Sequence, residues 1–182
     1  RAGVDLTKIS VATSKIVYLD ADSTVTYEAA HNYLFSSWNT VYASTLDHFG
    51  MQEYHLGSEM VDFSQTPESV TVNFKDGRSV TSDLLVAADG IGSSARSKLI
   101  PSCKSEYSGY VAWRGMVPES QLSAEMVERL GSAITYFVYP HSHILVYPIP
   151  DHDGRVSPGN RLINFVWYCN YAVGEEFNTL MT

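Results

Sequence analysis

Hydrophobic and polar residues alternate with a period of two along many stretches of the chain, and this pattern predicts β-strands. In the first half of the chain these stretches are short and separated by turn residues. In the second half they are longer and rich in aromatic side chains. The predicted strands cover residues 15–20, 24–27, 53–56, 59–64, 69–74, 78–81, 107–117, 133–139, 143–149 and 161–171. Because Asp76-Gly77 readily forms a tight turn, the strands on either side of it are predicted to form a hairpin.

A different period, close to that of an α-helix, follows the second predicted strand. The apolar positions with this spacing are Trp38, Val41, Tyr42, Leu46 and Phe49. Ser36 or Ser37 can cap the start of this helix, and Gly50 can end it. Shorter helices are predicted over residues 94–99, 120–130 and 174–181.

The most informative stretch is Asp83–Arg96, where an apolar run leads into Asp89-Gly90 and then into small residues. The run over residues 83–88 predicts a strand buried on both faces, which would deliver Asp89 to a glycine turn and a short helix. Ligands of open α/β sheets gather at the carboxyl ends of strands, and helix N-termini favour phosphate. The stretch therefore predicts a ligand contact, although Asp89 as a plain helix cap explains the local sequence equally well.

The pattern of elements changes near residues 102–106, and we predict a domain boundary there. Residues 1–104 have an α/β pattern, and residues 105–182 have a mainly antiparallel one. The predicted fold class is therefore α/β (α+β), with a nucleotide-binding type of domain followed by a sheet that contacts a substrate.

Charge and composition exclude several classes of function. The chain has 12 Lys and Arg against 20 Asp and Glu, a net charge of -8, and no long basic tract, which argues against nucleic acid. We find neither an apolar run long enough for a membrane span nor a secretory signal. Cys103 and Cys169 are too few for a disulfide scaffold and lack metal spacing, so a reducing, cytoplasmic location is expected. The histidines show no metal-site spacing either.

Polar residues within the aromatic strands are the remaining candidates. Arg114 lies between Trp113 and Gly115, and a buried arginine needs a ligand or a carboxylate partner. Asn164 lies on an otherwise apolar strand face and has the same requirement.

Taken together, these motifs resemble the single-component FAD-dependent aromatic hydroxylases, and most of all their 2,6-dihydroxypyridine hydroxylase and salicylate hydroxylase-like branch. The segments that carry the resemblance are Ser36–Asn39, Tyr54–Gly57, Asp83–Arg96, Tyr110–Gly115 and Arg161–Tyr168. The family's G-x-G-x-x-G unit and its later Gly-Asp motif do not occur in this chain. The expectation is a central segment, with residues 1–104 as a partial Rossmann-like FAD-binding domain and 105–182 as a partial substrate domain.

The resemblance implies an enzyme that uses NAD(P)H to reduce FAD and hydroxylates an aromatic or N-heteroaromatic ring with O₂ through a flavin hydroperoxide. It implies FAD contacts from Asp89, Gly90, Ser93 and Arg96. It also implies substrate contacts from the strand on which His143 and Tyr147 share a face, while Arg114 and Asn164 are substrate candidates on the residue arguments above. No residue is predicted to be catalytic, because the cofactor carries the chemistry.

Three questions stay open at this level. A homodimer is an option that the sequence neither requires nor excludes. A truncated, non-catalytic chain that binds no cofactor alone, and an epoxidase or decarboxylase on the same fold, are the alternatives to hydroxylation.

Overall fold

The structure, a computed structural model, describes residues 3–181 and divides into two compact units. One unit contains the described residues up to Gly50 together with those from Gly109 onward. The other is Met51–Ser108. The two units are groups of residues that contact one another in space. The predicted boundary between residues 104 and 105 instead divides an FAD-binding part from a substrate-binding part, and it stays a prediction. Each unit is described by itself.

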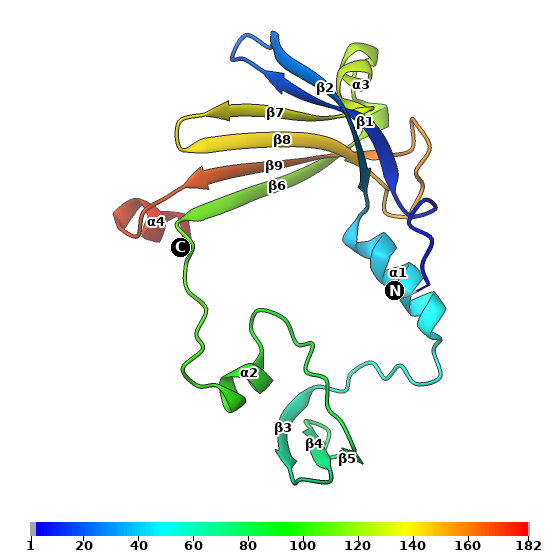
Figure 1. The fold of residues 1–182 in the computed structure, drawn as a ribbon, viewed down its shortest axis with the longest axis vertical. Coiled ribbons are helices and arrows are strands. Elements are labelled where there is room, and N and C mark those ends of the chain that lie inside the picture. The colour runs from blue at the N-terminus through cyan, green and yellow to red at the C-terminus, as the bar shows by residue number, and fades with distance from the viewer. Residues whose placement is uncertain (1–2, 182) are drawn as a thin grey trace. The chain divides into compact units, whose positions relative to one another are not determined.

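A six-stranded sheet dominates the first unit, with strand order β2-β1-β7-β8-β9-β6 (Figure 1). Its strands are β1 (Val11–Leu19), β2 (Val25–Phe35), β6 (Tyr110–Pro118), β7 (Ala133–Tyr139), β8 (Ser142–Ile149) and β9 (Leu162–Asn170). Neighbours run antiparallel except β1 and β7, which are parallel. The mainly antiparallel sheet predicted for the second half of the chain is therefore confirmed, and two strands from the first half extend it.

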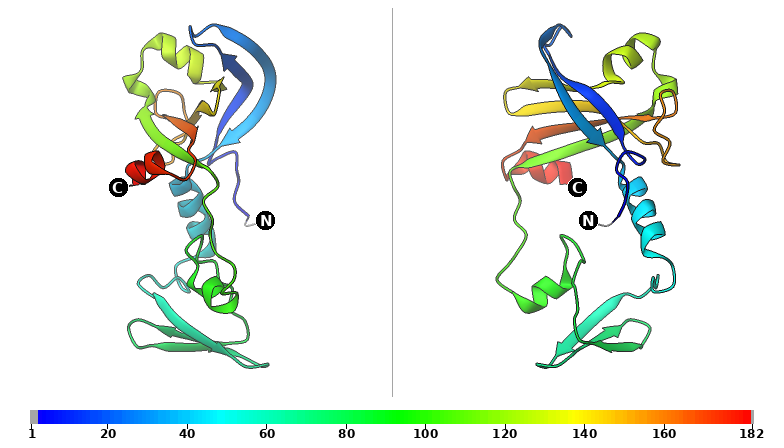
Figure 2. Two further views of the ribbon diagram at one scale, coloured as in Figure 1. Left: turned by 90° about the vertical axis from the view of Figure 1, so that its left-hand side faces the viewer. Right: turned by 45° about the vertical axis from the view of Figure 1, so that its right-hand side comes forward.

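Three helices and a 3₁₀ turn belong to the same unit: α1 (Trp38–Phe49), α3 (Ala124–Leu130), α4 (Glu175–Met181) and η1 (Glu119–Gln121). The structure confirms the predicted capping of α1, because the Ser37 side chain accepts a hydrogen bond from the Thr40 N–H and Gly50 ends the helix. The apolar side of α1 is largely exposed, with Trp38 at 75% and Phe49 at 63%. The helix α3 lies at one end of the sheet, near β7 (Figure 2).

A buried ion pair joins the turn after β6 to the start of β9. Glu119 and Arg161 are 1% and 8% exposed. The Arg161 guanidinium donates to both carboxylate oxygens of Glu119, with Nε at 3.0 Å from Oε2, and its Nη1 donates to the Gly131 carbonyl at 2.8 Å. The Gly159 N–H adds a further bond to Glu119 at 2.6 Å. Because the two charges face each other and both groups are hydrogen-bonded, the charges compensate each other away from water.

The second unit is a small antiparallel sheet with one helix. Its strands are β3 (Met60–Gln65), β4 (Val70–Phe74) and β5 (Ser79–Ser82), and α2 (Ser94–Leu99) packs beside them. Phe63, Val70, Val72 and Ala95 form its buried core. The predicted β4–β5 hairpin is confirmed, with Gly77 at a φ of 88° as the tight turn requires.

The predicted buried strand over residues 83–88 is wrong for this structure. These residues form no strand, and Leu84 and Val86 are 73% and 75% exposed. A strand needs a neighbour that accepts and donates its backbone hydrogen bonds, and within residues 3–181 no strand pairs with this segment. The short strand predicted over residues 53–56 is likewise absent.

None of the described helices is both long and apolar enough to cross a membrane.

Candidate functional site

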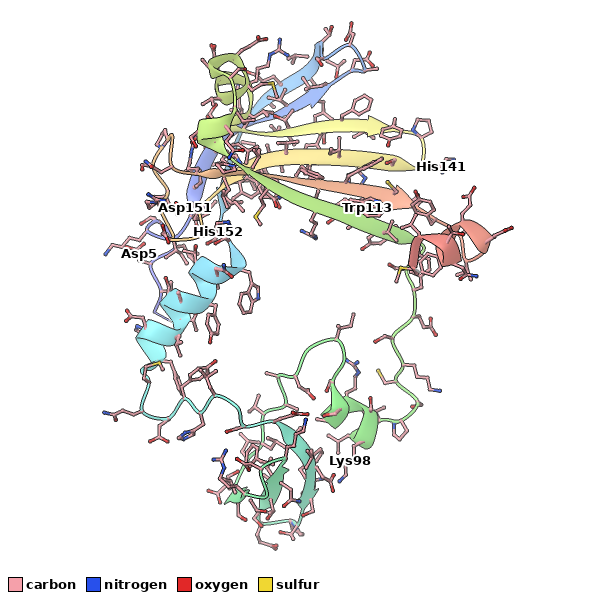
Figure 3. All side chains as sticks on the ribbon, turned by 180° about the vertical axis from the view of Figure 1, so that it is seen from behind. Asp5, Lys98, Trp113, His141, Asp151 and His152 are labelled. Atoms are coloured by element: carbon pink, nitrogen blue, oxygen red, sulfur yellow. The ribbon has the colours of Figure 1, made fainter. Side chains whose placement is uncertain are left out.

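A cavity of about 350 Å³ lies where β6, β8 and β9 meet the first turn of α1, all within the first unit. Its walls come from sheet side chains, from α1 and from the loop after β8. Figure 3 shows Asp151 and His152 of that loop near the start of α1. Residues that line it include Arg114, Met116, Tyr147, Asn164, Trp38 and His152.

The strand register brings three of the predicted substrate residues together. Asn164 pairs with both Met116 and Tyr147, and directly paired residues point to the same face of a sheet. Arg114 lies two residues from Met116 and shares that face. The predicted residues Arg114, Tyr147 and Asn164 therefore line one cavity.

The fourth predicted substrate residue, His143, lies apart from them. It is on the same face of β8 as Tyr147 but four residues away, and it does not line the cavity. Its ring stacks on Tyr168, with ring centroids 4.9 Å apart.

Two polar groups in the cavity have unused hydrogen-bonding capacity. Within residues 3–181, Arg114 forms no ion pair with a carboxylate. Asn164 is 8% exposed, and its buried Nδ2 has no hydrogen-bond partner among the described residues. A buried N–H group without a partner costs free energy, so both groups are suited to a ligand that accepts hydrogen bonds.

Burial raises the pKa of the Tyr147 phenol above its ordinary value. The nearby Arg114 cation and Asn164 amide lower the pKa of the phenol, but by less than burial raises it. Tyr147 therefore stays protonated at neutral pH and can donate a hydrogen bond to a ligand. Its ring also stacks on Phe35, with centroids 4.3 Å apart, which fixes its direction.

The first turn of α1 adds a polar edge and an aromatic wall to the cavity. Ser36 donates to the Ile9 carbonyl, and Ser37 caps the helix. This fixes the position of the first helical turn, where backbone N–H groups carry a partial positive charge. Trp38 lines the cavity and stacks on Tyr42, with centroids 5.1 Å apart.

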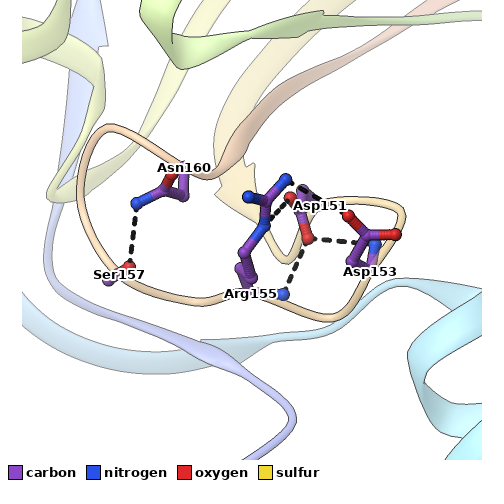
Figure 4. Close-up of polar contacts among 5 residues, drawn as sticks. All are labelled: Asp151, Asp153, Arg155, Ser157 and Asn160. Atoms are coloured by element: carbon purple, nitrogen blue, oxygen red, sulfur yellow. Dashed lines mark hydrogen bonds and ion pairs between the residues drawn. The ribbon is translucent and has the colours of Figure 1, made fainter.

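The loop after β8 is held rigid by one carboxylate. Asp151 accepts hydrogen bonds from the Asp153 N–H at 3.0 Å, the Arg155 N–H at 2.7 Å and Arg155 Nε at 2.6 Å (Figure 4). Burial alone would raise the pKa of Asp151, but these bonds outweigh it and lower the pKa. The result is a fixed loop that holds His152 at the edge of the cavity.

Sequence reasoning missed three of these wall residues. The strand period that identified Arg114 could also have identified Met116, which is two residues along the same face. Nothing in the local sequence places Trp38 or His152 beside β9, because their position depends on how α1 and the loop pack on the sheet.

The predicted cofactor residues form a compact turn in the second unit. Asp89 accepts hydrogen bonds from the hydroxyls of Ser93 (2.5 Å) and Ser94 (3.3 Å) and from the Ala95 N–H (3.2 Å). The bond from Ser93 is the main cause of a lowered pKa of Asp89. Asp89 is thus an ionised residue that stabilises the start of α2, as the capping interpretation requires.

Arg96 also stabilises this turn, through hydrogen bonds to its backbone. Its guanidinium donates to the carbonyls of Gly90 and Ile91. It forms no ion pair with Asp89 among the described residues, so Arg96 acts on the backbone of the turn rather than on the Asp89 carboxylate.

The turn at Gly90 leaves room for a ligand to approach the backbone. Gly90 has a φ of 75°, and a Cβ at Gly90 or Gly92 would meet no atom within 4 Å. A flat or phosphate-bearing group can therefore come close to the main chain here. Among residues 3–181, no three His, Cys, Asp or Glu side chains gather into a group that could hold a metal ion.

Comparison with known proteins shows what the chain is similar to. Residues 107–182 match a protein family described as FAD binding domain-like. Across 99% of its length the chain is 32% identical to the 2,6-dihydroxypyridine 3-monooxygenase of Paenarthrobacter nicotinovorans. Over nearly its whole length, the chain is thus similar to part of an aromatic-ring monooxygenase, and the family model that it matches is an FAD-binding one.

Solved structures of hydroxylases share the fold. The structure of 2,6-dihydroxypyridine-3-hydroxylase from Arthrobacter nicotinovorans matches 99% of the chain with a TM-score of 0.87 and 31% identity. HpxO of Klebsiella pneumoniae, solved with FAD and uric acid, matches 94% of the chain with a TM-score of 0.73; at 22% identity, this shows the fold alone. The predicted fold class, part of a Rossmann-like FAD-binding domain followed by a mainly antiparallel sheet, is confirmed.

The chain spans only part of these hydroxylases. It covers 45% of the length of the Paenarthrobacter enzyme and 45% of the Arthrobacter structure.

Proposed function

We propose that the protein functions as an FAD- and NAD(P)H-dependent monooxygenase that hydroxylates an aromatic or N-heteroaromatic ring with O₂. The observation that carries this proposal is the cavity on the sheet, which combines aromatic walls with unused hydrogen-bond donors. A planar ring with oxygen substituents fits such a cavity, because its faces are apolar and its edge accepts hydrogen bonds. The hydroxylases to which the chain is similar act on rings of this kind, as their names state.

Three side chains would hold the substrate. Arg114 would pair with a negatively charged substituent, and the buried Nδ2 of Asn164 would donate to a ring oxygen or nitrogen. The Tyr147 phenol, kept protonated by burial, would donate a third hydrogen bond. His143 lies on the same face of the sheet outside the cavity, and we propose it as a contact for a larger substrate.

The turn at Asp89-Gly90 would hold part of the FAD. Gly90 leaves its backbone open to the cofactor, while Asp89, Ser93 and Arg96 fix the shape of the turn. Bound FAD would supply the redox and oxygen-transfer chemistry. The protein's part is to orient the ring and to exclude water.

We also propose an electron donor, a cellular location and an oligomeric state for the enzyme. NAD(P)H is the proposed source of electrons, and a cytoplasmic location agrees with two unpaired cysteines. We include a homodimer as a hypothesis, which sedimentation of the purified protein would check.

The test uses the full-length protein. The purified protein should be yellow, and 2,6-dihydroxypyridine should stimulate its oxidation of NADH or NADPH with formation of a hydroxylated product. Arg114→Gln should raise the KM for the ring substrate, whereas Arg78→Gln, in the exposed hairpin of the other unit, should not. A colourless folded protein, or cofactor oxidation without any hydroxylated product from a panel of ring substrates, would overturn the proposal. A product with an epoxide or a lost carboxyl group would assign the chemistry to another branch of the fold.

A further inference from the structure

The thioether of Met116 lies at the wall of the candidate substrate cavity and is open to small reagents. Met116 belongs to β6, lines the cavity and is 54% exposed. Methionine is one of the residues that proteins most often bury, and exposure makes its sulfur susceptible to oxidation. Within residues 3–181, no other methionine lines this cavity. Oxidation of Met116 would therefore change the cavity, whereas oxidation of another described methionine would not.

The neighbouring Arg114 gives such an oxidation a consequence. Alternate residues of a strand point to the same face, so the side chains of Arg114 and Met116 start about 7 Å apart on one face of β6. Both side chains are long, exposed and part of the cavity wall, so they can meet there. Among the described residues Arg114 forms no ion pair with a carboxylate, which leaves its guanidinium with donors for a new acceptor.

Hydrogen peroxide is the oxidant for this step. A lone pair of the Met116 sulfur forms a bond to one peroxide oxygen while the O–O bond breaks, and the products are the sulfoxide and water. The sulfur loses two electrons and the peroxide gains them. NAD(P)H oxidation by O₂ without a ring to hydroxylate would supply this peroxide, because two electrons reduce O₂ to the peroxide level. The apolar thioether becomes a polar group whose oxygen accepts hydrogen bonds.

We propose that Met116 is a site of oxidative modification that closes the candidate substrate cavity to its ring substrate. The sulfoxide oxygen accepts a hydrogen bond from the Arg114 guanidinium and so occupies a donor that the substrate would use. Methionine sulfoxide reductases convert the sulfoxide back to the thioether, which makes the modification reversible. The inference rests on the proposed function, because it concerns the regulation of that same cavity.

The test treats the full-length protein with dilute hydrogen peroxide and then with a thiol reductant, which restores reversibly oxidised cysteines but not methionine sulfoxide. Peptide masses identify the oxidised methionines, and calorimetry measures the affinity for 2,6-dihydroxypyridine before and after treatment. Oxidation at Met116 should weaken binding by roughly tenfold, as expected for the loss of one hydrogen bond to a charged group. Methionine sulfoxide reductases of both epimer specificities should restore the affinity.

Three variants separate Met116 from the other methionines. Met116→Leu should bind the ring equally before and after treatment, because its side chain cannot be oxidised. Met51→Leu is the matched control, since Met51 is 62% exposed but does not line the cavity, and this variant should lose affinity as the parent does. Met116→Gln, whose amide oxygen imitates the sulfoxide oxygen, should bind more weakly than Met116→Leu without any peroxide.

The NMR signal of the Arg114 Nε–H group provides a readout that needs no substrate. Treatment should shift this signal in the parent and in Met51→Leu but not in Met116→Leu. If the untreated protein does not bind 2,6-dihydroxypyridine, the proposed function loses its support, and the Arg114 signal still decides the present inference. The inference is overturned if peroxide leaves Met116 unoxidised while Met51 is oxidised, if Met116→Leu loses affinity like the parent, or if Met116 sulfoxide leaves the Arg114 signal unchanged.

Discussion

Replacing Glu119 by Gln should strongly destabilise the large sheet. Gln keeps the shape of the side chain but removes its charge, and it sets an amide NH₂ against one of the donors that now meet the carboxylate. Those donors come from Arg161 and from the Gly159 N–H. Both charged residues are almost fully buried, so the Arg161 charge would be left without compensation. Loss of one partner of such a pair costs about 3 kcal/mol, at the lower end of the measured range.

The chain offers a local reporter of this effect. Cys169 of β9 is 8% exposed, and the other cysteine, Cys103, is exposed and can be replaced by Ser. In the Cys103→Ser background, a thiol reagent reaches Cys169 mainly when the sheet opens. A loss of about 3 kcal/mol should raise the labelling rate more than a hundredfold, at about 1.4 kcal/mol per factor of ten.

Two controls separate charge from packing. Glu125→Gln removes an exposed carboxylate that lies 3.6 Å from Arg129, and it should change the labelling rate by no more than about fivefold, because exposed pairs contribute roughly 0–1 kcal/mol. Replacing Glu119 and Arg161 together by Leu should cost less than either single replacement, because no buried charge is left alone. If Glu119→Gln labels Cys169 at the parental rate, the pair does not stabilise the sheet and the reasoning fails.

The same pair predicts a pH dependence with a definite sign. Burial alone would raise the pKa of Glu119, but the bonds from Arg161 and Gly159 outweigh it, and the pKa in the folded state lies below its ordinary value. The stabilisation is therefore fully present above the pKa of an unfolded glutamate, about 4.3. It is lost as the pH falls through the lower, folded-state pKa. The difference between the parent and Glu119→Gln should shrink only in that acidic range, and a difference that shrinks near neutral pH would contradict this assignment.

Three further predictions concern the two candidate sites. Ser93→Ala should speed hydrogen exchange at the Arg96 amide by several-fold, because a lost N-cap bond costs about 1 kcal/mol; unchanged exchange would remove the capping role. Asn164→Leu should leave stability equal or higher, because its Nδ2 has no partner, yet it should weaken binding of the ring substrate by roughly tenfold; a parallel loss of stability would show a structural role instead. In an ultraviolet titration, the Tyr147 phenol should ionise above the ordinary tyrosine pKa, and Arg114→Gln should shift it higher still; a downward shift would contradict their proximity.

Local sequence was sufficient where local interactions determine the structure. The Asp76-Gly77 hairpin and the Ser37 cap of α1 both follow from hydrogen bonds and backbone angles within a few residues. The period of two along the aromatic strands also showed that His143 and Tyr147 share a face. It could not show that Arg114 and Asn164 reach the same cavity as Tyr147, since that depends on the register of three strands.

The failed predictions concern interactions between distant segments. The apolar run over residues 83–88 has the composition of a buried strand, but a strand forms only where a neighbouring strand pairs with it. The Glu119–Arg161 pair was not predicted either, because its partners are 42 residues apart and neither stands out by composition. In the same way, the position of Trp38 at the cavity depends on how α1 packs rather than on its own sequence.

The proposed hydroxylation of an aromatic ring with O₂ can be measured directly. The most direct measurement supplies the full-length protein with FAD, NAD(P)H, 2,6-dihydroxypyridine and isotopically labelled O₂, and determines the mass of the product. We expect a product that contains one labelled oxygen atom. With Arg114→Gln, this product should be lost or should form only at much higher substrate concentration. A product whose added oxygen comes from water would contradict the proposal. NAD(P)H oxidation that yields only reduced oxygen species, with this and every other ring tested, would contradict it as well.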